Sequence, residues 1–159
     1  SLVGSEMCIR DSINDFRLSL AKTLGADRTV NVTREKLEDV MKELEMTEGF
    51  DVCLEMSGAP SCLKDIIDNS RNGANISLLG IQPDGSSIEW NKFIWKGLKM
   101  KGIYGREIFE TWHKMDSMIR SGLNIAPIIT HRLPYTEFRE GFEAMNSGKS
   151  GKVVLDWIV

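Results

Sequence analysis

Apolar and polar positions along the chain follow two patterns, one typical of helices and one typical of strands. Leu37, Val40, Met41 and Leu44, for example, are spaced to share one face of a helix. The helical pattern predicts helices over residues 14–24, 33–44, 60–70, 91–97, 107–121 and 136–146. Runs rich in β-branched and aliphatic residues predict strands over 29–32, 50–56, 75–79, 99–104, 128–133 and 153–157, and a short edge strand over 86–90.

This alternation of strands and helices predicts an α/β fold. Short connections between strands and single helices are typical of a parallel sheet with right-handed crossovers. Because the pattern starts on a helix, we expect a partial Rossmann-type, doubly wound parallel sheet that lacks its first strands. In the strand order 3-2-1-4-5-6 those strands occupy the middle of the sheet. We therefore expect no neighbour for the strand at 29–32, an open apolar edge on the strand at 50–56, and marginal stability for the chain alone.

The first twelve residues, SLVGSEMCIRDS, do not share this pattern. They show neither helical nor strand periodicity and lead abruptly into the first predicted helix. They resemble translated sequencing-adapter read-through, so we predict that residues 1–12 are not native and exclude them from the fold. A genuine loop or an expression scar is the alternative.

Composition and charge narrow the class of protein. With 159 residues, 42% of them hydrophobic and 27% charged, the chain is typical of one soluble globular domain. A net charge of −3 without a basic block gives no support for a nucleic-acid partner, and no apolar run is long enough to span a membrane. Three widely spaced cysteines and no visible secretory signal favour a cytoplasmic protein. The only histidines are His113, expected on a solvated helix face, and His131, expected to be structural, so we expect no complete zinc site.

Five segments carry a resemblance to a known family. They are EGFDVCLEMSGAP at 48–60, ISLLGI at 76–81, KGIYGREIFETW at 101–112, PIITHRLP at 127–134 and FREGFEAMNSGKSGKVVLDW at 138–157. Together they resemble the zinc-dependent medium-chain dehydrogenase/reductase family, and within it the L-threonine 3-dehydrogenases, but only their C-terminal part. The resemblance implies a partial NAD-binding domain over residues 13–125. It also implies a C-terminal segment over 126–159 that packs with the catalytic domain of the complete enzyme.

The resemblance also implies an activity. Family members of this kind oxidise the 3-hydroxyl of L-threonine to 2-amino-3-oxobutanoate with NAD, aided by a catalytic zinc, and are commonly tetramers. Their zinc ligands and proton relay lie in an N-terminal domain that this sequence does not contain. We therefore expect no catalytic and no metal-ligating residue here, and no activity from this chain alone. Another zinc-dependent alcohol or polyol dehydrogenase, or a non-catalytic association module, remains an alternative.

The candidate cofactor contacts follow two of the predicted strands. Leu79, Gly80 and Ile81 end one strand, and Ile103 and Tyr104 end the next. Ligands of doubly wound sheets bind at the carboxyl ends of the strands. The resemblance implies that these residues contact NAD, with Ile103 and Tyr104 beside the nicotinamide. Without it, they would be interpreted as an ordinary turn, a core residue and a surface aromatic.

Arg17 is the candidate contact at the adenosine end. The resemblance places its guanidinium, which can stack on adenine or bind the ribose, on the first helix; a solvated helix charge is the alternative. The family has an acidic residue five positions earlier, where this sequence has Ser12, with Asp11 one place off. Losing such charge-assisted bonds costs on the order of 1.5–3 kcal/mol, so we expect weakened NAD affinity. Lys152 matches a pyrophosphate-binding position of some relatives, but a surface lysine is the favoured interpretation.

Overall fold

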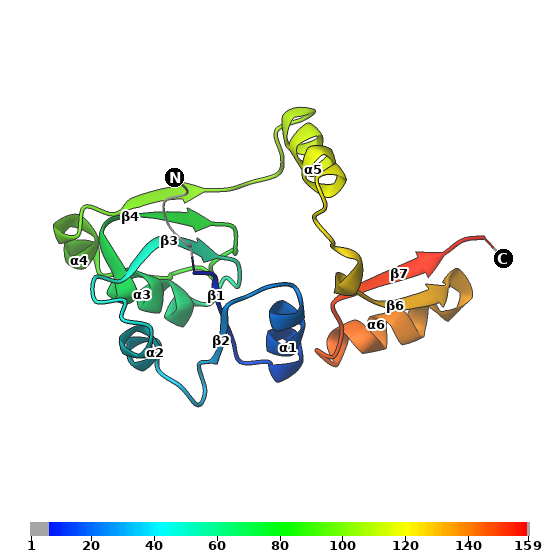
Figure 1. Cartoon of the computed structure of the whole chain (residues 1–159), viewed down its shortest axis with the longest axis horizontal. Coiled ribbons are helices and arrows are strands. Elements are labelled where there is room, and N and C mark those ends of the chain that lie inside the picture. Colours follow the sequence, from blue (N-terminus) through cyan, green and yellow to red (C-terminus); the bar gives the residue numbers. More distant parts are fainter. Residues whose placement is uncertain (1–6, 159) are drawn as a thin grey trace. The chain divides into compact units, whose positions relative to one another are not determined.

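The structure is a computed structural model that describes residues 7–158. It is an α/β fold in which every strand pairing of the described residues is parallel (Figure 1). The chain divides into two compact units. Unit 1 combines residues 1–36 with 108–159, and unit 2 comprises residues 37–107. The prediction of a partial, parallel α/β sheet is confirmed.

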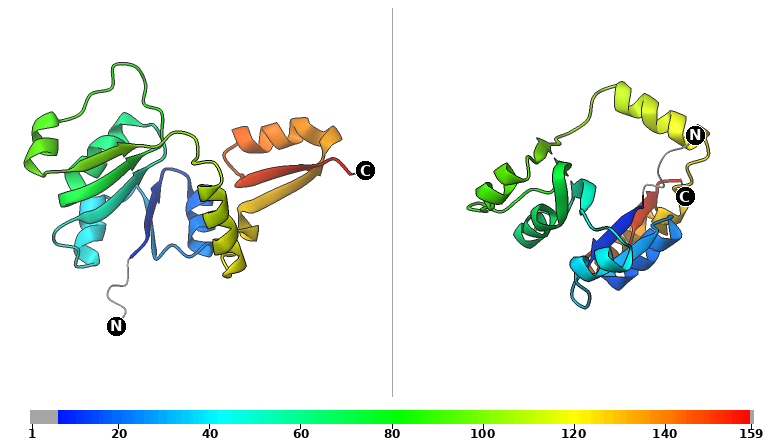
Figure 2. Two further views of the ribbon diagram at one scale, coloured as in Figure 1. Left: turned by 90° about the horizontal axis from the view of Figure 1, so that it is seen from above. Right: turned by 60° about the vertical axis from the view of Figure 1, so that its left-hand side comes forward.

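Unit 2 is a three-stranded parallel sheet with its connecting helices. The strand order is β3-β4-β5. The elements are α2 (Leu37–Glu43), β3 (Phe50–Glu55), α3 (Pro60–Asn69), β4 (Ser70–Leu78), α4 (Trp90–Trp95) and β5 (Lys99–Gly102). Pro60 stands in the first turn of α3, where its missing N–H costs no hydrogen bond. Because β3, α3 and β4 form one β-α-β crossover, the carboxyl ends of the strands lie at the same edge of the sheet (Figure 2).

The core of unit 2 lies between α3 and the sheet. Leu63 and Ile67, four residues apart on α3, are buried, as are Cys53 of β3 and Ile76 of β4. Ile67 and Ile76 are each only 1% exposed. Burial of a large aliphatic side chain contributes about 1.5–3 kcal/mol, so this layer holds α3 on the sheet.

Unit 1 begins with a second β-α-β arrangement. Strand β1 (Ile9–Ser12) pairs in parallel with β2 (Arg28–Asn31), and α1 (Asp15–Thr23) connects them. The Asn14 side chain accepts a hydrogen bond from the Arg17 N–H at 3.1 Å and so caps the start of α1. Leu18 of α1 is buried in this unit.

The C-terminal part of unit 1 repeats the same arrangement after a long helix. Its elements are α5 (Glu110–Arg120), the 3-10 turn η1 (Ala126–Ile128), β6 (Ile129–Pro134), the 3-10 turn η2 (Tyr135–Glu137), α6 (Phe138–Asn146) and β7 (Lys152–Asp156). Strands β6 and β7 pair in parallel, and α6 lies along one side of the pair (Figure 2). Gly141 of α6 lets the helix approach the sheet, because a Cβ there would meet Val153 Cγ1 at 3.2 Å.

The structure corrects the prediction that the ordered chain starts on a helix. Residues 9–12 form β1, so β2 has a neighbour and the expectation of an unpaired strand at 29–32 was wrong. Backbone pairing with β2, and a hydrogen bond from the Cys8 N–H to Asp27 Oδ2 at 2.7 Å, hold β1 although it has no alternating apolar pattern. Residues 1–6 lie outside the described residues. The origin of residues 1–12 and the domain boundary at residue 125 stay predictions.

The structure also replaces the predicted edge strand at 86–90 with a loop. Gly85 has a φ of 78°, and the Ser86 side chain donates to the Pro83 carbonyl at 2.6 Å. These local contacts close a turn, and Trp90 then begins α4. The expected open edge is confirmed: β3 ends the strand order, and Val52 and Leu54 of β3 are exposed.

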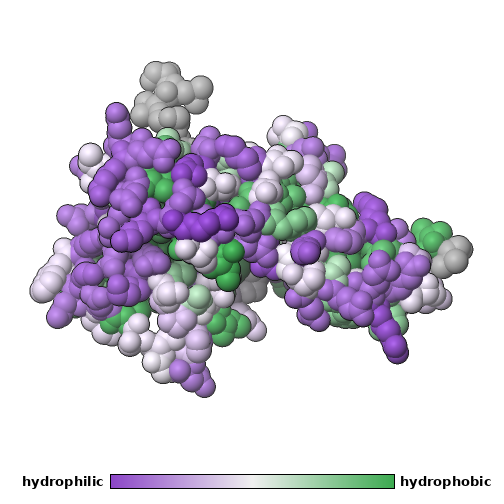
Figure 3. All heavy atoms as spheres, turned by 90° about the horizontal axis from the view of Figure 1, so that it is seen from below, coloured by the Kyte–Doolittle hydropathy of each residue, from purple (hydrophilic) through white to green (hydrophobic). Residues whose placement is uncertain are grey.

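Apolar side chains reach the surface in several places among polar ones (Figure 3). Helix α5 exposes Trp112, Met115 and Met118, and α6 exposes Phe142. Within residues 7–158, no helix has both the length and the apolar character to cross a bilayer.

Candidate functional site

The segments that follow β3, β4 and β5 meet at the carboxyl edge of the unit 2 sheet. The backbone N–H groups of Leu79 and Gly80 donate to the Glu55 carbonyl at 2.9 and 3.1 Å. The Ile103 N–H donates to the Leu78 carbonyl at 2.7 Å. The structure therefore brings the segment after β4 beside the end of β3, and the start of the segment after β5 beside the end of β4.

Five of the six predicted contact residues lie on this edge and in unit 2. Leu79 is 47% exposed and Ile103 is 37% exposed, whereas Ile81 and Tyr104 project almost wholly into solvent. Their apolar side chains are thus accessible at the strand ends, where a ligand of a parallel sheet binds.

Two glycines let the chain pack tightly at this edge. A Cβ on Gly80 would overlap the backbone nitrogen of Gly58 and Oε2 of Glu55. Gly58 itself has a φ of 73°, and a Cβ there would overlap the Ile81 carbonyl oxygen. The turn after β3 and the segment after β4 are therefore in direct backbone contact, which only glycine allows at both positions.

A buried carboxylate lies beneath this contact. Glu55, the last residue of β3, is 0% exposed. Burial raises the pKa of its carboxyl, but hydrogen bonds from Ser57, Gly58 and Gln82 outweigh burial, so the pKa lies below its ordinary value. The carboxylate is therefore ionised at neutral pH. The sequence contained one signal for it, an acidic residue that ends an apolar strand two positions before a Ser-Gly pair, but a polar strand position does not by itself indicate burial.

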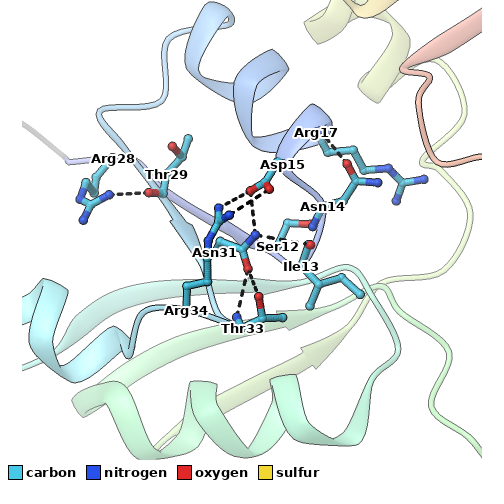
Figure 4. A network of polar contacts seen from close by, with 10 residues as sticks. All are labelled: Ser12, Ile13, Asn14, Asp15, Arg17, Arg28, Thr29, Asn31, Thr33 and Arg34. Atoms are coloured by element: carbon cyan, nitrogen blue, oxygen red, sulfur yellow. Dashed lines mark hydrogen bonds and ion pairs between the residues drawn. The ribbon is translucent and has the colours of Figure 1, made fainter.

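Arg17, the sixth predicted contact, belongs to unit 1. Its side chain is exposed and extends from α1 away from the neighbouring ion pair of Asp15 and Arg34 (Figure 4). Asp15 also accepts from Asn31 Nδ2 at 2.7 Å, and these partners lower the pKa of its carboxyl. The Arg17 guanidinium is thus accessible to a ligand, while the nearby Asp15 carboxylate is already engaged.

The last residue of β1 is not acidic. The strand ends at Ser12, whose hydroxyl accepts from the Asn14 N–H at 3.1 Å, and Asp11 immediately precedes it. Weakened NAD affinity through the replacement of an acidic residue by Ser12 stays a prediction.

A hollow of about 670 Å³ opens between α1 and β2 in unit 1. Of its charged lining residues, Arg28 pairs with Glu35 at 2.6 Å, and Lys22 donates to the Asp27 carbonyl at 2.6 Å. The rest of the lining is mostly polar, with the apolar Leu18 among it. The sequence did not predict this hollow, because its walls come from side chains with no shared motif.

No metal centre is assembled within residues 7–158: no group of three or more His, Cys, Asp or Glu side chains is placed to hold an ion. His113 is exposed on α5, and His131 of β6 has its Nδ1 2.9 Å from the Thr130 hydroxyl. Cys53 is buried with its sulfur 3.4 Å from the Ser70 hydroxyl. The described residues thus do not fit a zinc ion.

The model of the zinc-binding dehydrogenase family matches residues 9–121, most of the chain. The chain belongs to this family. The match includes β1 as well as the carboxyl edge with Leu79, Gly80 and Ile103. It places the candidate site of this zinc-binding dehydrogenase chain inside the region that defines the family.

Individual relatives agree with this assignment. L-threonine 3-dehydrogenase of Aeromonas salmonicida is 57% identical over 155 residues, which are 98% of this chain and 45% of the relative. The chain thus spans less than half the length of the curated relatives it matches. An alcohol dehydrogenase of Thermotoga maritima has a similar structure, with 26% identity and a TM-score of 0.81 over 96% of this chain and 43% of that one. A short chain alcohol dehydrogenase of Escherichia coli CFT073 in complex with NADH gives a TM-score of 0.82 at 20% identity, over 96% of this chain and 45% of that one.

The carboxyl edge of unit 2 carries exposed apolar side chains at the strand ends, where parallel sheets bind ligands. Beside the close contact of Gly80 with Gly58, the side chains of Leu79, Ile81 and Ile103 are exposed. The chain has no G-x-G-x-x-G segment to hold a pyrophosphate, and the last residue of β1 is not acidic.

Proposed function

We propose that the chain is the C-terminal, NAD-binding part of an NAD-dependent L-threonine 3-dehydrogenase. The complete enzyme oxidises the 3-hydroxyl of L-threonine to 2-amino-3-oxobutanoate, and bound NAD accepts the hydride. The observation that carries the proposal is the 57% identity to the Aeromonas salmonicida enzyme over 98% of this chain. The exposed, glycine-dependent edge of the unit 2 sheet supports the cofactor part of the proposal.

In this proposal the chain's residues bind and orient the cofactor rather than transfer protons. The backbone of Leu79, Gly80 and Ile81 lines the nicotinamide end. Ile103 and Tyr104 flank the ring, where their apolar surfaces exclude water from the site of hydride transfer. Arg17 meets the adenosine end through its guanidinium.

The remaining parts belong to the complete protein. We expect the zinc ligands of the family to lie outside residues 7–158, since those residues assemble no metal centre. We also expect a cytoplasmic homo-oligomer, a tetramer as is common in the family, with neither nucleic acid nor a membrane as partner. The chain alone is expected to be inactive.

A chimera tests whether this chain can serve as the cofactor-binding part of an L-threonine 3-dehydrogenase. Residues 13–159 of this chain replace the corresponding part of the Aeromonas salmonicida relative. NADH formation is then followed by its absorbance, with L-threonine, 2-propanol and sorbitol as separate substrates. We expect NADH formation with L-threonine and far less with the other two. Preferential oxidation of 2-propanol or sorbitol would favour the alcohol or polyol dehydrogenase alternative. An inactive but cooperatively folded chimera would favour an association module.

A further inference from the structure

We propose that Glu55 and Gln82 are positioning residues for the nicotinamide end of the cofactor site. Through them, the turn after β3 is tied to the segment Leu79–Ile81 after β4. The inference rests on the proposed function, because it assigns a role to two side chains that hold the cofactor-binding backbone without touching the cofactor.

One oxygen of Glu55 holds the turn after β3. Oε1 accepts from the Ser57 N–H at 2.8 Å, from the Ser57 hydroxyl at 2.6 Å and from the Gly58 N–H at 2.9 Å. Three donors on one ionised oxygen form a charge-assisted set, which is stronger than neutral hydrogen bonds. The turn is thus fixed on the end of β3.

The other groups of Glu55 hold the segment after β4. Its main-chain carbonyl accepts from the N–H groups of Leu79 and Gly80, and Oε2 accepts from Gln82 Nε2 at 3.2 Å. A single buried residue therefore contacts both segments, one through Oε1 and the other through Oε2 and its carbonyl. The backbones of Gly58 and Gly80 are packed so closely that neither can move towards the other. A shift of the turn therefore also moves the backbone that is proposed to lie beside the nicotinamide.

The side-chain amide of Gln82 has only one possible orientation in its hydrogen bond to Glu55. A carboxylate only accepts hydrogen bonds, so the amide must turn its NH₂ group towards Glu55. This leaves Gln82 Oε1 buried without a hydrogen-bond partner among the described residues. A buried, unpaired acceptor is unfavourable, so the charged bond to Glu55 is what holds the amide in place.

Exchanging the carboxylate and the amide between positions 55 and 82 tests whether their hydrogen bond positions the segment after β4. Glu55→Gln removes the charge, and Gln82→Glu sets two carboxylates against each other. In the double variant Glu55→Gln/Gln82→Glu, the new amide keeps an oxygen towards Ser57 and donates its NH₂ to the new carboxylate. We expect the dissociation constant of reduced nicotinamide mononucleotide to rise about tenfold in each single variant, and the double variant to recover a large part of the loss. Asp51→Asn, an exposed acid on the same strand, serves as the matched control and changes nothing.

Two readouts separate positioning from general destabilisation. The first is binding of ADP-ribose, which lacks the nicotinamide: its affinity stays unchanged in all variants if the effect is confined to the nicotinamide end. The second is amide hydrogen exchange of Leu79 and Gly80 in the ligand-free chain, whose bonds to the Glu55 carbonyl do not involve the altered side chains. We expect faster exchange in both single variants and restored protection in the double variant.

The outcomes distinguish the inference from the function on which it rests. If the original chain binds reduced nicotinamide mononucleotide and the single variants bind it equally well, the positioning role is wrong and the proposed function stands. If amide hydrogen exchange at Leu79 and Gly80 is unchanged in the single variants, Glu55 and Gln82 do not hold this segment, whether or not a cofactor binds. If the original chain binds neither nucleotide, the proposed cofactor function fails and the positioning role fails with it.

Discussion

Gly80 shows how a single residue limits the geometry of the candidate site. Its hydrogen faces the Gly58 backbone and the buried Glu55 carboxylate, where a Cβ has no space. Neither neighbour is the free end of a flexible side chain, because Glu55 is fixed by its hydrogen bonds. The close packing of the segment after β4 against the turn after β3 therefore depends on the absence of a side chain at Gly80.

The first prediction concerns Gly80→Ala. Overpacking against fixed backbone costs about 1–3 kcal/mol, so we expect that loss in the free energy of unfolding, measured by urea denaturation, together with weaker NADH binding. Gly102→Ala is the matched control: it lies at the end of β5, and a Cβ there meets nothing within 4 Å. Equal losses in both variants would mean that the contact with Gly58 is not what makes Gly80 necessary.

The second prediction concerns the pH dependence that Glu55 confers. Because the pKa of its carboxyl is lowered in the folded state from an ordinary value of 4.5, the carboxylate stabilises the fold above that value. The contribution is lost as the pH falls through the folded-state pKa. We expect the difference in unfolding free energy between the original chain and Glu55→Gln to be constant near neutral pH and to shrink below pH 4.5. Urea unfolding across this range measures it, and a difference that persists unchanged in strong acid would refute the charged state assigned to Glu55.

At the scale of elements, the C-terminal end of α3 is held by a lysine from the next helix. Lys96, directly after α4, donates from Nζ to the carbonyls of Ile67, Asp68 and Ser70 at 2.9, 2.7 and 2.9 Å. The last carbonyls of a helix have no partner within it, and the helix dipole favours a cation there. Lys96 therefore fixes α3, and with it the strand β4 that leads to the site.

The third prediction is that Lys96→Met destabilises unit 2. The variant keeps an apolar stem but removes three charge-assisted bonds, so we expect a loss of about 2 kcal/mol in unfolding free energy. Lys64→Met on α3 is the control, because the Lys64 side chain is 60% exposed in its single ion pair with Asp68, and an ion pair of an exposed lysine contributes about 1 kcal/mol or less. Similar losses of unfolding free energy in the two variants would contradict the proposed role of Lys96 at the end of α3. An unchanged unfolding free energy in Lys96→Met would contradict it too.

The elements also show how far the sequence alone could predict this fold. The helix predicted at 60–70 is α3, because Leu63 and Ile67 recur at the spacing that buries one face. Strand β1 was missed, since its residues have no apolar alternation and its pairing partner lies beyond α1. The segment at 86–90 was predicted as a strand from its composition, but the turn at Gly85 outweighs that composition, and α4 begins at Trp90.

The candidate site was predictable to the same extent and for the same reason. Leu79 and Ile103 end strands, and strand ends of a parallel sheet meet at one edge, so the sequence pattern indicated both. The proposed roles of Glu55 and Gln82 depend on how two loops distant in the sequence lie against each other, and no local sequence pattern predicts that. Whether the predicted residues bind NAD stays a prediction.

For the whole molecule, the open edge of β3 decides how the chain behaves alone. Strand β3 has a hydrogen-bonded neighbour only on the β4 side, and Val52 and Leu54 are exposed on it at 61% and 46%. An unprotected apolar edge favours pairing with another chain. The complete relatives are more than twice as long as the segment matched here, at 45% coverage.

The fourth prediction is that Val52→Lys reduces self-association of the chain. A lysine on an edge strand opposes strand-to-strand pairing between molecules. Sedimentation velocity is expected to show a smaller fraction of large species than for the original chain. Ile108→Lys is the control, because it replaces a residue that is similarly exposed, at 63%, but lies outside any strand. An equal reduction by both variants would point to general solubility rather than to the β3 edge.

The most direct test of the central claim is an NMR titration of the labelled chain with NADH. The account predicts that the backbone amides of Leu79, Gly80, Ile81, Ile103 and Tyr104 shift together along one saturating curve. Their segments lie at the edge that ends β4 and β5, where the nicotinamide is proposed to bind. Saturable shifts confined to other residues, or no shift in these amides at any NADH concentration, would contradict it.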